Sequence, residues 1–308
     1  MRQLKGVLAF ILMPFRKDGS INFEVLGREV DWALEQGVDG VLPLGSIGEF
    51  YALSHDERLK VMSYVIERAK GDVLAVAGAS ALTTAESIQF AKHAADCGYD
   101  AVMVVPPFYY TCQEEEVYTH YSMIAKATDL QLMVYHNPHL SKFFMRPPFI
   151  ARLAGIPNVT AFKETNSELV HMQNEMALVG DKLAVFHVHK SFLWNLMLGG
   201  KGGTIAPFAI PTAVEIYKLF QKDKIKEAMA LQMRLGRIFP EGSEESVGSQ
   251  ARFKAASSIV TGLEMGEPRL PYRTYQAEHP VMLGPAETKA VLKKRLKDLH
   301  MLPAGKSS

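Results

Sequence analysis

The feature that most constrains this 308-residue sequence is the alternation of short apolar runs with amphipathic stretches of helical length. Apolar runs flanked by helices are typical of parallel strands that are buried on both faces of a sheet. The predicted strands are Gly6–Met13, Gly40–Leu44, Val73–Ala77, Ala101–Val105, Gln131–Tyr135, Val159–Lys163, Leu183–Val188 and Gly203–Ala206. The predicted helices are Phe23–Gln36, His55–Lys70, Thr84–Cys97, Glu114–Ala127, Pro147–Leu153, Leu169–Val179, Ser191–Leu198 and Thr212–Gln221. The pattern predicts an α/β fold.

Eight such units within about 220 residues favour a closed TIM (β/α)8 barrel over an open sheet. An open dinucleotide-binding sheet would carry GxGxxG after its first strand, and this sequence has no such motif there. After Gln221 the strand pattern stops, and Ile225–Phe239, Ser249–Gly262 and Ala286–Leu299 have helical patterns. We therefore predict a barrel domain over residues 1–222 and a C-terminal helical region over residues 223–308 that packs on it.

Composition excludes several classes of partner and of location. The formal net charge is +1, which offers no electrostatic basis for binding nucleic acid or an anionic membrane. The apolar run after Arg2 and Lys5 is shorter than the ~20 residues of a membrane helix, and Pro14–Arg16 is not a signal cleavage site. The two cysteines, Cys97 and Cys112, cannot form a disulfide framework. These features predict a cytoplasmic protein.

Reactive side chains are expected where strands end, because barrel enzymes place their active sites at the C-terminal ends of the strands. The second strand runs into the glycine-containing loop Gly45–Glu49, the fifth ends at Tyr135 and the sixth at Lys163. A solvated lysine is a poor nucleophile, whereas a desolvated one can be neutral and attack a carbonyl carbon. A tyrosine two units earlier, in Pro106–Tyr110, could relay the proton released when the carbinolamine loses water.

The sequence resembles the dihydrodipicolinate synthase/N-acetylneuraminate lyase family along almost its whole length. The matching segments are GVLAFILMPFRKDGSIN, GSIGEFYALSHDER, PPFYYTCQEE, VYHNP, NVTAFKET, LGGKGGTIA and PRLPY. The resemblance implies a class I lyase or aldolase that forms a lysine Schiff base with pyruvate or a related 2-keto acid. It also implies a homotetramer built from tight dimers, and no metal or organic cofactor.

The resemblance assigns a role to each matching residue. Lys163 is implied to be the Schiff-base lysine, and Tyr135 the phenol that shuttles protons and positions the substrate carbonyl. Ser46 is implied to hydrogen-bond this tyrosine and to help the loop Gly45–Gly48 hold the keto-acid carboxylate. Tyr109 is implied to complete the proton relay in a neighbouring subunit's active site.

Four further positions are assigned by the resemblance or depart from it. Val188 falls where the family offers a backbone carbonyl, and Ile205 is implied to line the pyruvate pocket. Ile47 replaces the second of two hydroxyl residues, so one side-chain donor to the carboxylate is missing. Leu140 stands where dihydrodipicolinate synthases carry an arginine at the mouth of the site, which argues against aspartate semialdehyde as substrate.

The residues after the seventh predicted strand also depart from the family. His189 and Lys190 stand where sialate lyases carry an acidic pair, and a basic pair would favour an anionic group on the distal part of the substrate. Sugar-acid aldolase and 2-keto-3-deoxy acid dehydratase remain as activities. His187 and His189 could also face a metal together, but a third ligand is not evident, so we predict no metal site.

Other interpretations of these residues stay open at this stage. One is true dihydrodipicolinate synthase activity with another carboxylate binder, and one is a non-catalytic barrel with a regulatory role, for which Ile47 is the only hint. Lys163 could be a surface lysine, Tyr109 could serve dimer packing, and Ser46 could cap the next helix.

Overall fold

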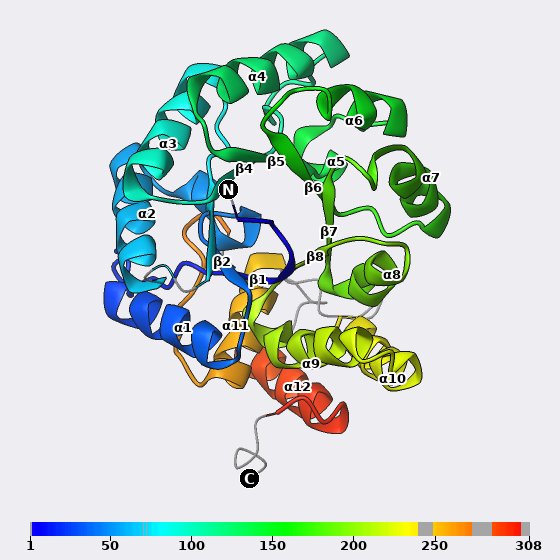
Figure 1. Cartoon of the computed structure of the whole chain (residues 1–308). Helices are drawn as coiled ribbons and strands as arrows, with labels where there is room; N and C mark the ends of the chain where they lie inside the picture. The colour runs from blue at the N-terminus through cyan, green and yellow to red at the C-terminus, as the bar shows by residue number, and fades with distance from the viewer. Residues whose placement is uncertain (1, 70, 72, 240–248, 273–284, 303–308) are drawn as a thin grey trace.

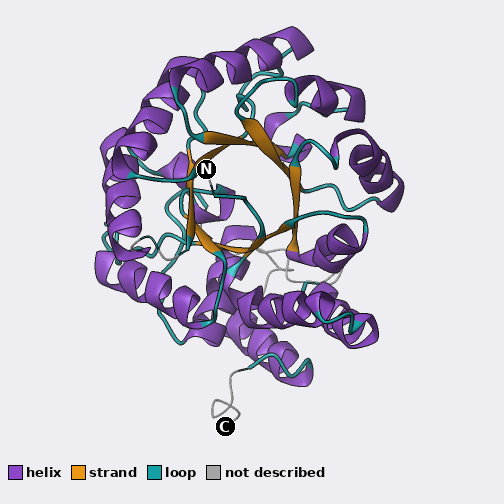
Figure 2. Ribbon diagram, viewed as in Figure 1, coloured by secondary structure: helices purple, strands orange, loops and turns teal. Residues whose placement is uncertain are grey.

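The computed structural model describes residues 2–69, 71, 73–239, 249–272 and 285–302. Eight parallel strands form a closed barrel in chain order, with β8 paired to β1 (Figure 2). The strands are β1 Gly6–Phe10, β2 Gly40–Leu42, β3 Leu74–Gly78, β4 Ala101–Val104, β5 Gln131–His136, β6 Val159–Glu164, β7 Ala184–Val188 and β8 Gly202–Ile205. The predicted TIM barrel is confirmed.

The helices form a ring outside the strands (Figure 1). Those of the barrel are α1 Phe23–Glu35, α2 His55–Ala69, α3 Thr84–Cys97, α4 Glu114–Ala127, α5 Pro138–Ser141, α6 Pro147–Leu153, α7 Leu169–Val179, α8 Phe192–Met197 and α9 Ile210–Gln221. Their ends follow local chemistry. At the start of α3 the Thr83 hydroxyl accepts a hydrogen bond from the Glu86 N–H, and Gly98, with φ +88°, ends the same helix.

The strands bury both of their faces, as their continuous apolar sequences predict. Alternate residues point into the barrel, where they form a core of Leu4, Leu8, Phe10, Leu42, Leu74, Val76, Ala101, Met103, Val105, Met133, Tyr135, Ala161 and Phe186. The residues between them point outward and join the helices in a larger core. A shift of one residue along a strand therefore moves a side chain from one core to the other.

The first strand is shorter than predicted. β1 ends at Phe10, although Ile11–Met13 are fully buried. The Leu12 N–H donates to the carboxylate of Glu29 on α1 at 2.9 Å instead of to a neighbouring strand. The chain therefore leaves the ladder while it stays inside the apolar core.

Among the described residues, three helices follow the barrel: α10 Ile225–Gly236, α11 Ser249–Thr261 and α12 Pro285–Asp298. In Figure 1 α10 lies beside α9 and α12 beside α11, and α11 passes behind the strands. The predicted division at residue 222 falls between α9 and α10. The helix α11 also reaches the loop after β2, because Lys254 and Glu49 form a buried ion pair with 2.6 Å between Nζ and Oε1.

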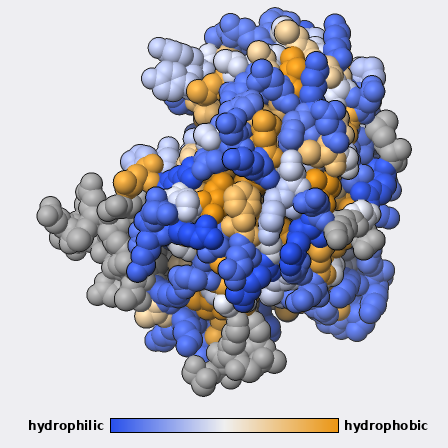
Figure 3. Space-filling model, turned by 90° about the vertical axis from the view of Figure 1, so that its left-hand side faces the viewer, coloured by the Kyte–Doolittle hydropathy of each residue, from blue (hydrophilic) through white to orange (hydrophobic). Residues whose placement is uncertain are grey.

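On the face shown in Figure 3, hydrophobic residues lie between hydrophilic ones. Within the described ranges, no helix combines the length and the apolar character needed to cross a bilayer. Both cysteines, Cys97 and Cys112, are free thiols.

Candidate active site

Lys163 and Tyr135 lie side by side inside the barrel, because they are register partners on β6 and β5. The Lys163 Nζ is 3.3 Å from the centroid of the Tyr135 ring and 5.1 Å from that of Phe10. The lysine is only 1% exposed. It is therefore a buried amine against a phenol and not a surface lysine.

The two groups alter each other's acidity. Burial lowers the pKa of Lys163, an effect that the neighbouring Tyr135 and Glu164 partly offset. Burial acts to raise the pKa of Tyr135, but the charge of Lys163 and the hydrogen bonds from Ser46 and Asn137 lower it below its ordinary value. Both pKa values are lower than those of the free side chains, so a proton can be exchanged between the Lys163 amine and the Tyr135 phenol.

Two side chains donate hydrogen bonds to the Tyr135 hydroxyl. The Ser46 Oγ donates from the loop after β2 at 3.4 Å, and the Asn137 Nδ2 donates at 2.8 Å. The contact between Ser46 and Tyr135 is the one that the resemblance implied. Asn137 was not predicted, although its place two residues after Tyr135, at the start of the next loop, allows its amide to fold back.

The loop after β2 lies tightly against the end of β1. A Cβ added at Gly45 would come within 2.2 Å of the Phe10 ring, and one at Gly48 within 2.8 Å of the Ile11 carbonyl oxygen. The N–H groups of Gly48 and Glu49 close the turn on the carbonyls of Gly45 and Ser46. Glycine is therefore required for this approach, which brings Ser46 to Tyr135.

Ile47 closes the loop with apolar contacts. It is half-buried and packs both on the core inside the barrel and on the cluster of Leu12, Leu263 and Met265. The position that lacks a hydroxyl therefore anchors the loop to the C-terminal region.

Tyr109 lies apart from Tyr135 within this chain. It is 71% exposed, its ring contacts that of Tyr110 edge-on, and its carbonyl accepts a hydrogen bond from Lys142. Leu140 is also exposed. Among the described residues, the hydrogen bonds to the Tyr135 hydroxyl come from Ser46 and Asn137 and not from Tyr109.

The Ile205 side chain points away from the barrel interior. Ile205 pairs with Ala9, and both belong to the outer core between strands and helices. Thr204, one residue earlier, pairs with Leu8, which points into the barrel. The Thr204 hydroxyl is buried and has no hydrogen-bond partner among the described residues. Thr204 also pairs with half-buried Val188, which therefore shares the inner face.

Of the predicted basic pair His189 and Lys190, one member is uncharged at pH 7. His189 is buried with its ring edge against Phe208, and burial lowers its pKa to about 4, so it is neutral at pH 7. Lys190 is exposed, and Gln232 holds the carbonyls of both residues. His187 points away from the barrel interior, with its Nδ1 3.2 Å from the Ser191 Oγ, and burial lowers its pKa to about 4 as well. Of these three residues, Lys190 is the one that carries a positive charge at pH 7 and could attract an anion.

Residues 3–286 match the dihydrodipicolinate synthetase family. The chain belongs to this family. It is 32% identical to a 4-hydroxy-tetrahydrodipicolinate synthase of Methanothrix thermoacetophila over 92% of this chain and 96% of the relative. It is 31% identical to an N-acetylneuraminate lyase of Rhizobium meliloti over 84% of this chain and 89% of the relative.

A solved structure of the family has a similar fold. The crystal structure of dihydrodipicolinate synthase from Acinetobacter baumannii complexed with pyruvate is 25% identical to this chain, with a TM-score of 0.85. The match covers 97% of this chain and 100% of that one. As a member of the dihydrodipicolinate synthetase family, the chain is a lyase that works through a lysine Schiff base.

Proposed function

We propose that the chain acts on pyruvate or a related 2-keto acid with Lys163 as its nucleophile. The observation that carries the proposal is the Lys163 Nζ, buried inside the barrel 3.3 Å from the centre of the Tyr135 ring. Burial lowers the pKa of this amine, which raises the fraction able to attack a carbonyl.

The reaction then uses the contacts around Tyr135. The keto-acid carboxylate lies on the loop Gly45–Gly48, and Lys163 attacks the carbonyl carbon. Loss of water gives a protonated imine that draws electrons from the adjacent bond. Tyr135, hydrogen-bonded by Ser46 and Asn137, moves the proton while a C–C bond is cleaved or a hydroxyl is eliminated. Hydrolysis of the imine frees the product.

The distal part of the substrate distinguishes two activities. Exposed Leu140 provides no carboxylate clamp at the mouth, which favours a 2-keto-3-deoxy sugar acid or a related 2-keto acid over aspartate semialdehyde. The second candidate is 4-hydroxy-tetrahydrodipicolinate synthase activity, the activity named for the relative at 32% identity. A coupled assay with pyruvate and aspartate semialdehyde separates the two.

The assembly that fits this site is a homotetramer, a dimer of dimers, located in the cytoplasm. Tyr109 and Tyr110 are 71% and 80% exposed next to the mouth-side loops, where a neighbouring subunit could receive them. Mixing inactive Tyr109→Ala and Lys163→Ala chains should restore part of the activity if Tyr109 serves the neighbour's site. Mixtures that stay inactive although the chains exchange would contradict this assembly.

Borohydride trapping tests the proposed function. Reduction in the presence of a panel of 2-keto acids, followed by mass mapping, should yield an adduct on Lys163. An adduct on another lysine would overturn the assignment of the nucleophile. No adduct with any member of the panel would favour the non-catalytic, regulatory barrel.

A further inference from the structure

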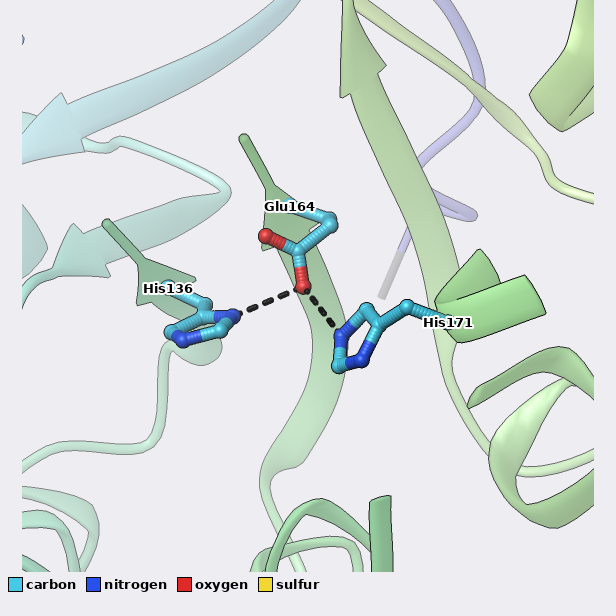
Figure 4. A group of neighbouring side chains, drawn as sticks. All are labelled: His136, Glu164 and His171. Carbon is cyan, nitrogen blue, oxygen red and sulfur yellow. Dashed lines mark hydrogen bonds and ion pairs between the residues drawn. The ribbon is translucent and has the colours of Figure 1, made fainter. Parts of the chain in front are cut away.

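A buried layer of ionisable side chains lies directly behind Lys163 and Tyr135. The ladder that pairs Tyr135 with Lys163 also pairs His136 with Glu164 at the next step. Because successive residues of a strand point to opposite faces, this second pair faces outward, toward α7. His136 and Glu164 are both completely buried. Their side chains point toward one another, and His171 lies on the other side of Glu164 (Figure 4).

Four N–H groups surround the Glu164 carboxylate. His136 Nδ1 and His171 Nε2 lie 2.7 and 3.2 Å from its Oε2. The backbone N–H groups of Thr165 and Asn166 donate to its Oε1 at 2.6 and 2.7 Å. Burial acts to raise the pKa of Glu164, but the hydrogen bonds from the two histidines lower it to about 2. This carboxylate is therefore ionised at neutral pH.

Hydrogen bonds, and not metal coordination, account for the arrangement of the cluster. One ligand atom from each of His136, Glu164 and His171 lies within 4.8 Å of the others, a spacing that could suit a metal ion. However, the Met145 N–H donates to His136 Nε2 at 3.0 Å, so Nε2 carries the lone pair. In the neutral ring the proton is then on Nδ1, which points at Glu164 and offers no lone pair to a metal.

A second carboxyl of the cluster differs from Glu164 in charge. Glu175 lies one turn after His171 on α7, with 3.9 Å between its Oε2 and His171 Nε2, and is 1% exposed. Neither of its oxygens has a hydrogen-bond partner among the residues that the structure describes. Burial and the charge of Glu164 raise the pKa of Glu175 to about 9. Two neighbouring carboxyls thus exist, one charged at neutral pH and one protonated.

We propose that Glu164 is a positioning residue for the Schiff-base step: its ionised carboxylate holds the end of β6 behind Lys163 and stabilises the protonated forms of that lysine. The inference rests on the proposed function. The hydrogen bonds to Thr165 and Asn166 fix the turn that follows the lysine, and the negative charge favours both the ammonium and the protonated imine.

Ionisable groups on its own strand and on the two flanking strands surround Lys163, and those that shift its pKa are Tyr135 and Glu164. Tyr135 faces it from β5, Glu164 follows it on β6, and His187, neutral at pH 7, lies on β7. The groups packed against Glu164 are His136 and His187 from the flanking strands and His171 and Glu175 from α7. Replacing Glu164 removes a charge from this set, whereas replacing Glu175 does not.

The test is the pH dependence of Schiff-base formation by the full-length protein. The initial rate of borohydride trapping is measured against pH with pyruvate, or with the 2-keto acid that gives the highest yield. In Glu164→Gln the midpoint of the rise should move down by about one pH unit, because the ammonium has lost a stabilising charge. The matched control Glu175→Gln exchanges a protonated carboxyl for an amide and should keep the wild-type midpoint.

A second variant covers the case in which Glu164→Gln does not fold. His171→Arg keeps an N–H donor to Glu164 and adds a permanent positive charge, so it should also lower the midpoint. A wild-type midpoint in Glu164→Gln, or in His171→Arg where the first variant is unfolded, overturns the inference. An equal shift in Glu175→Gln also overturns it, because that shift would be structural. If wild-type protein forms no adduct, the proposed function itself fails.

Discussion

The two sides of the active site are held in different ways. On the lysine side, Lys163 and Tyr135 are neighbours in one strand ladder, and their outer partners His136 and Glu164 repeat the same step. On the opposite side, Ser46 lies in the loop after β2. Its backbone carbonyl accepts a hydrogen bond from the side chain of Gln250, 204 residues later in the chain. Lys163 and Tyr135 are therefore anchored within the barrel, whereas the loop after β2 depends on the C-terminal region.

The C-terminal contacts to the loop are charged and mostly buried. Lys254 pairs with Glu49, and the backbone N–H of Arg269 donates to the other oxygen of the Glu49 carboxylate at 3.1 Å. The Arg269 guanidinium binds Glu57 and the Ala52 carbonyl. Changes on this side should affect stability and KM, whereas changes on the lysine side should affect kcat.

The largest effect is expected for Lys163→Ala. Without the amine no imine can form, so both the borohydride adduct and turnover should disappear. The fold should survive, because the side chain makes its contacts inside the barrel and leaves the strand ladder intact. Lys201→Ala, at an exposed position, is the control for lysine loss. An adduct that persists in Lys163→Ala would show that another residue is the nucleophile, and the chemistry would then not lie on the lysine side.

Tyr135→Phe should come next. It keeps the ring that packs against Lys163 but removes the hydroxyl that Ser46 and Asn137 contact. Loss of a proton-transfer group should lower kcat on the order of 100- to 1,000-fold, with a smaller change in KM. Steady-state kinetics measure both, and a wild-type kcat would show that another group moves the proton.

Lys254→Met tests the stability of the loop side. It leaves Glu49 as a buried charge without its lysine, which should reduce the free energy of unfolding by about 3 to 5 kcal/mol. Urea unfolding measures the loss. Lys289→Met removes an exposed ion pair with Glu264 and should cost no more than about 1 kcal/mol. Equal losses of unfolding free energy in the two variants would show that the buried ion pair stabilises the protein no more than the exposed one.

A matched pair of amide deletions separates binding from chemistry. Gln250→Ala removes one hydrogen bond to the Ser46 carbonyl and should raise KM roughly fivefold with kcat nearly unchanged. Asn137→Ala removes one hydrogen bond to the Tyr135 hydroxyl and should lower kcat roughly tenfold with KM nearly unchanged. Should both variants change the same constant, the two sides would not be independent.

The smallest effect concerns the ion pair of Glu57 and Arg269. The hydrogen bond from Arg269 is the main cause that lowers the pKa of Glu57 to about 2. Between pH 4.5 and 2 the unfolded chain binds this proton more readily, so the contribution is complete above pH 4.5 and is lost as the pH falls toward 2. Glu57→Gln should cost about 1 kcal/mol at pH 7 and nothing near pH 2, in thermal unfolding at several pH values.

Several parts of the site could be predicted because they depend on local pattern. An apolar strand that ends in lysine, a tyrosine at the end of the preceding strand and a glycine loop all lie at the same end of a barrel. Ser46 and Tyr135, 89 residues apart in the chain, meet for this reason. The face of Ile205 could not be predicted in this way, because a shift of one residue reverses the face of a strand.

Other features depend on contacts that the pattern does not specify. His189 looked like half of a basic pair, but burial against Phe208 makes it neutral. Glu164 and Glu175 are the same residue type, but hydrogen bonds from two histidines keep Glu164 ionised, whereas burial and the charge of Glu164 keep Glu175 protonated. Their charges therefore belong to the folded protein and not to the residue type.

The amino-acid sequence alone determined the barrel, the order of its strands and the residues at their C-terminal ends, because hydrophobic periodicity acts over short stretches of chain. The tertiary structure decided which of these side chains are charged, which face the barrel interior, and that Gln250 and Lys254 hold the loop after β2. The physical reason is that desolvation and hydrogen bonding depend on neighbours brought from distant parts of the chain.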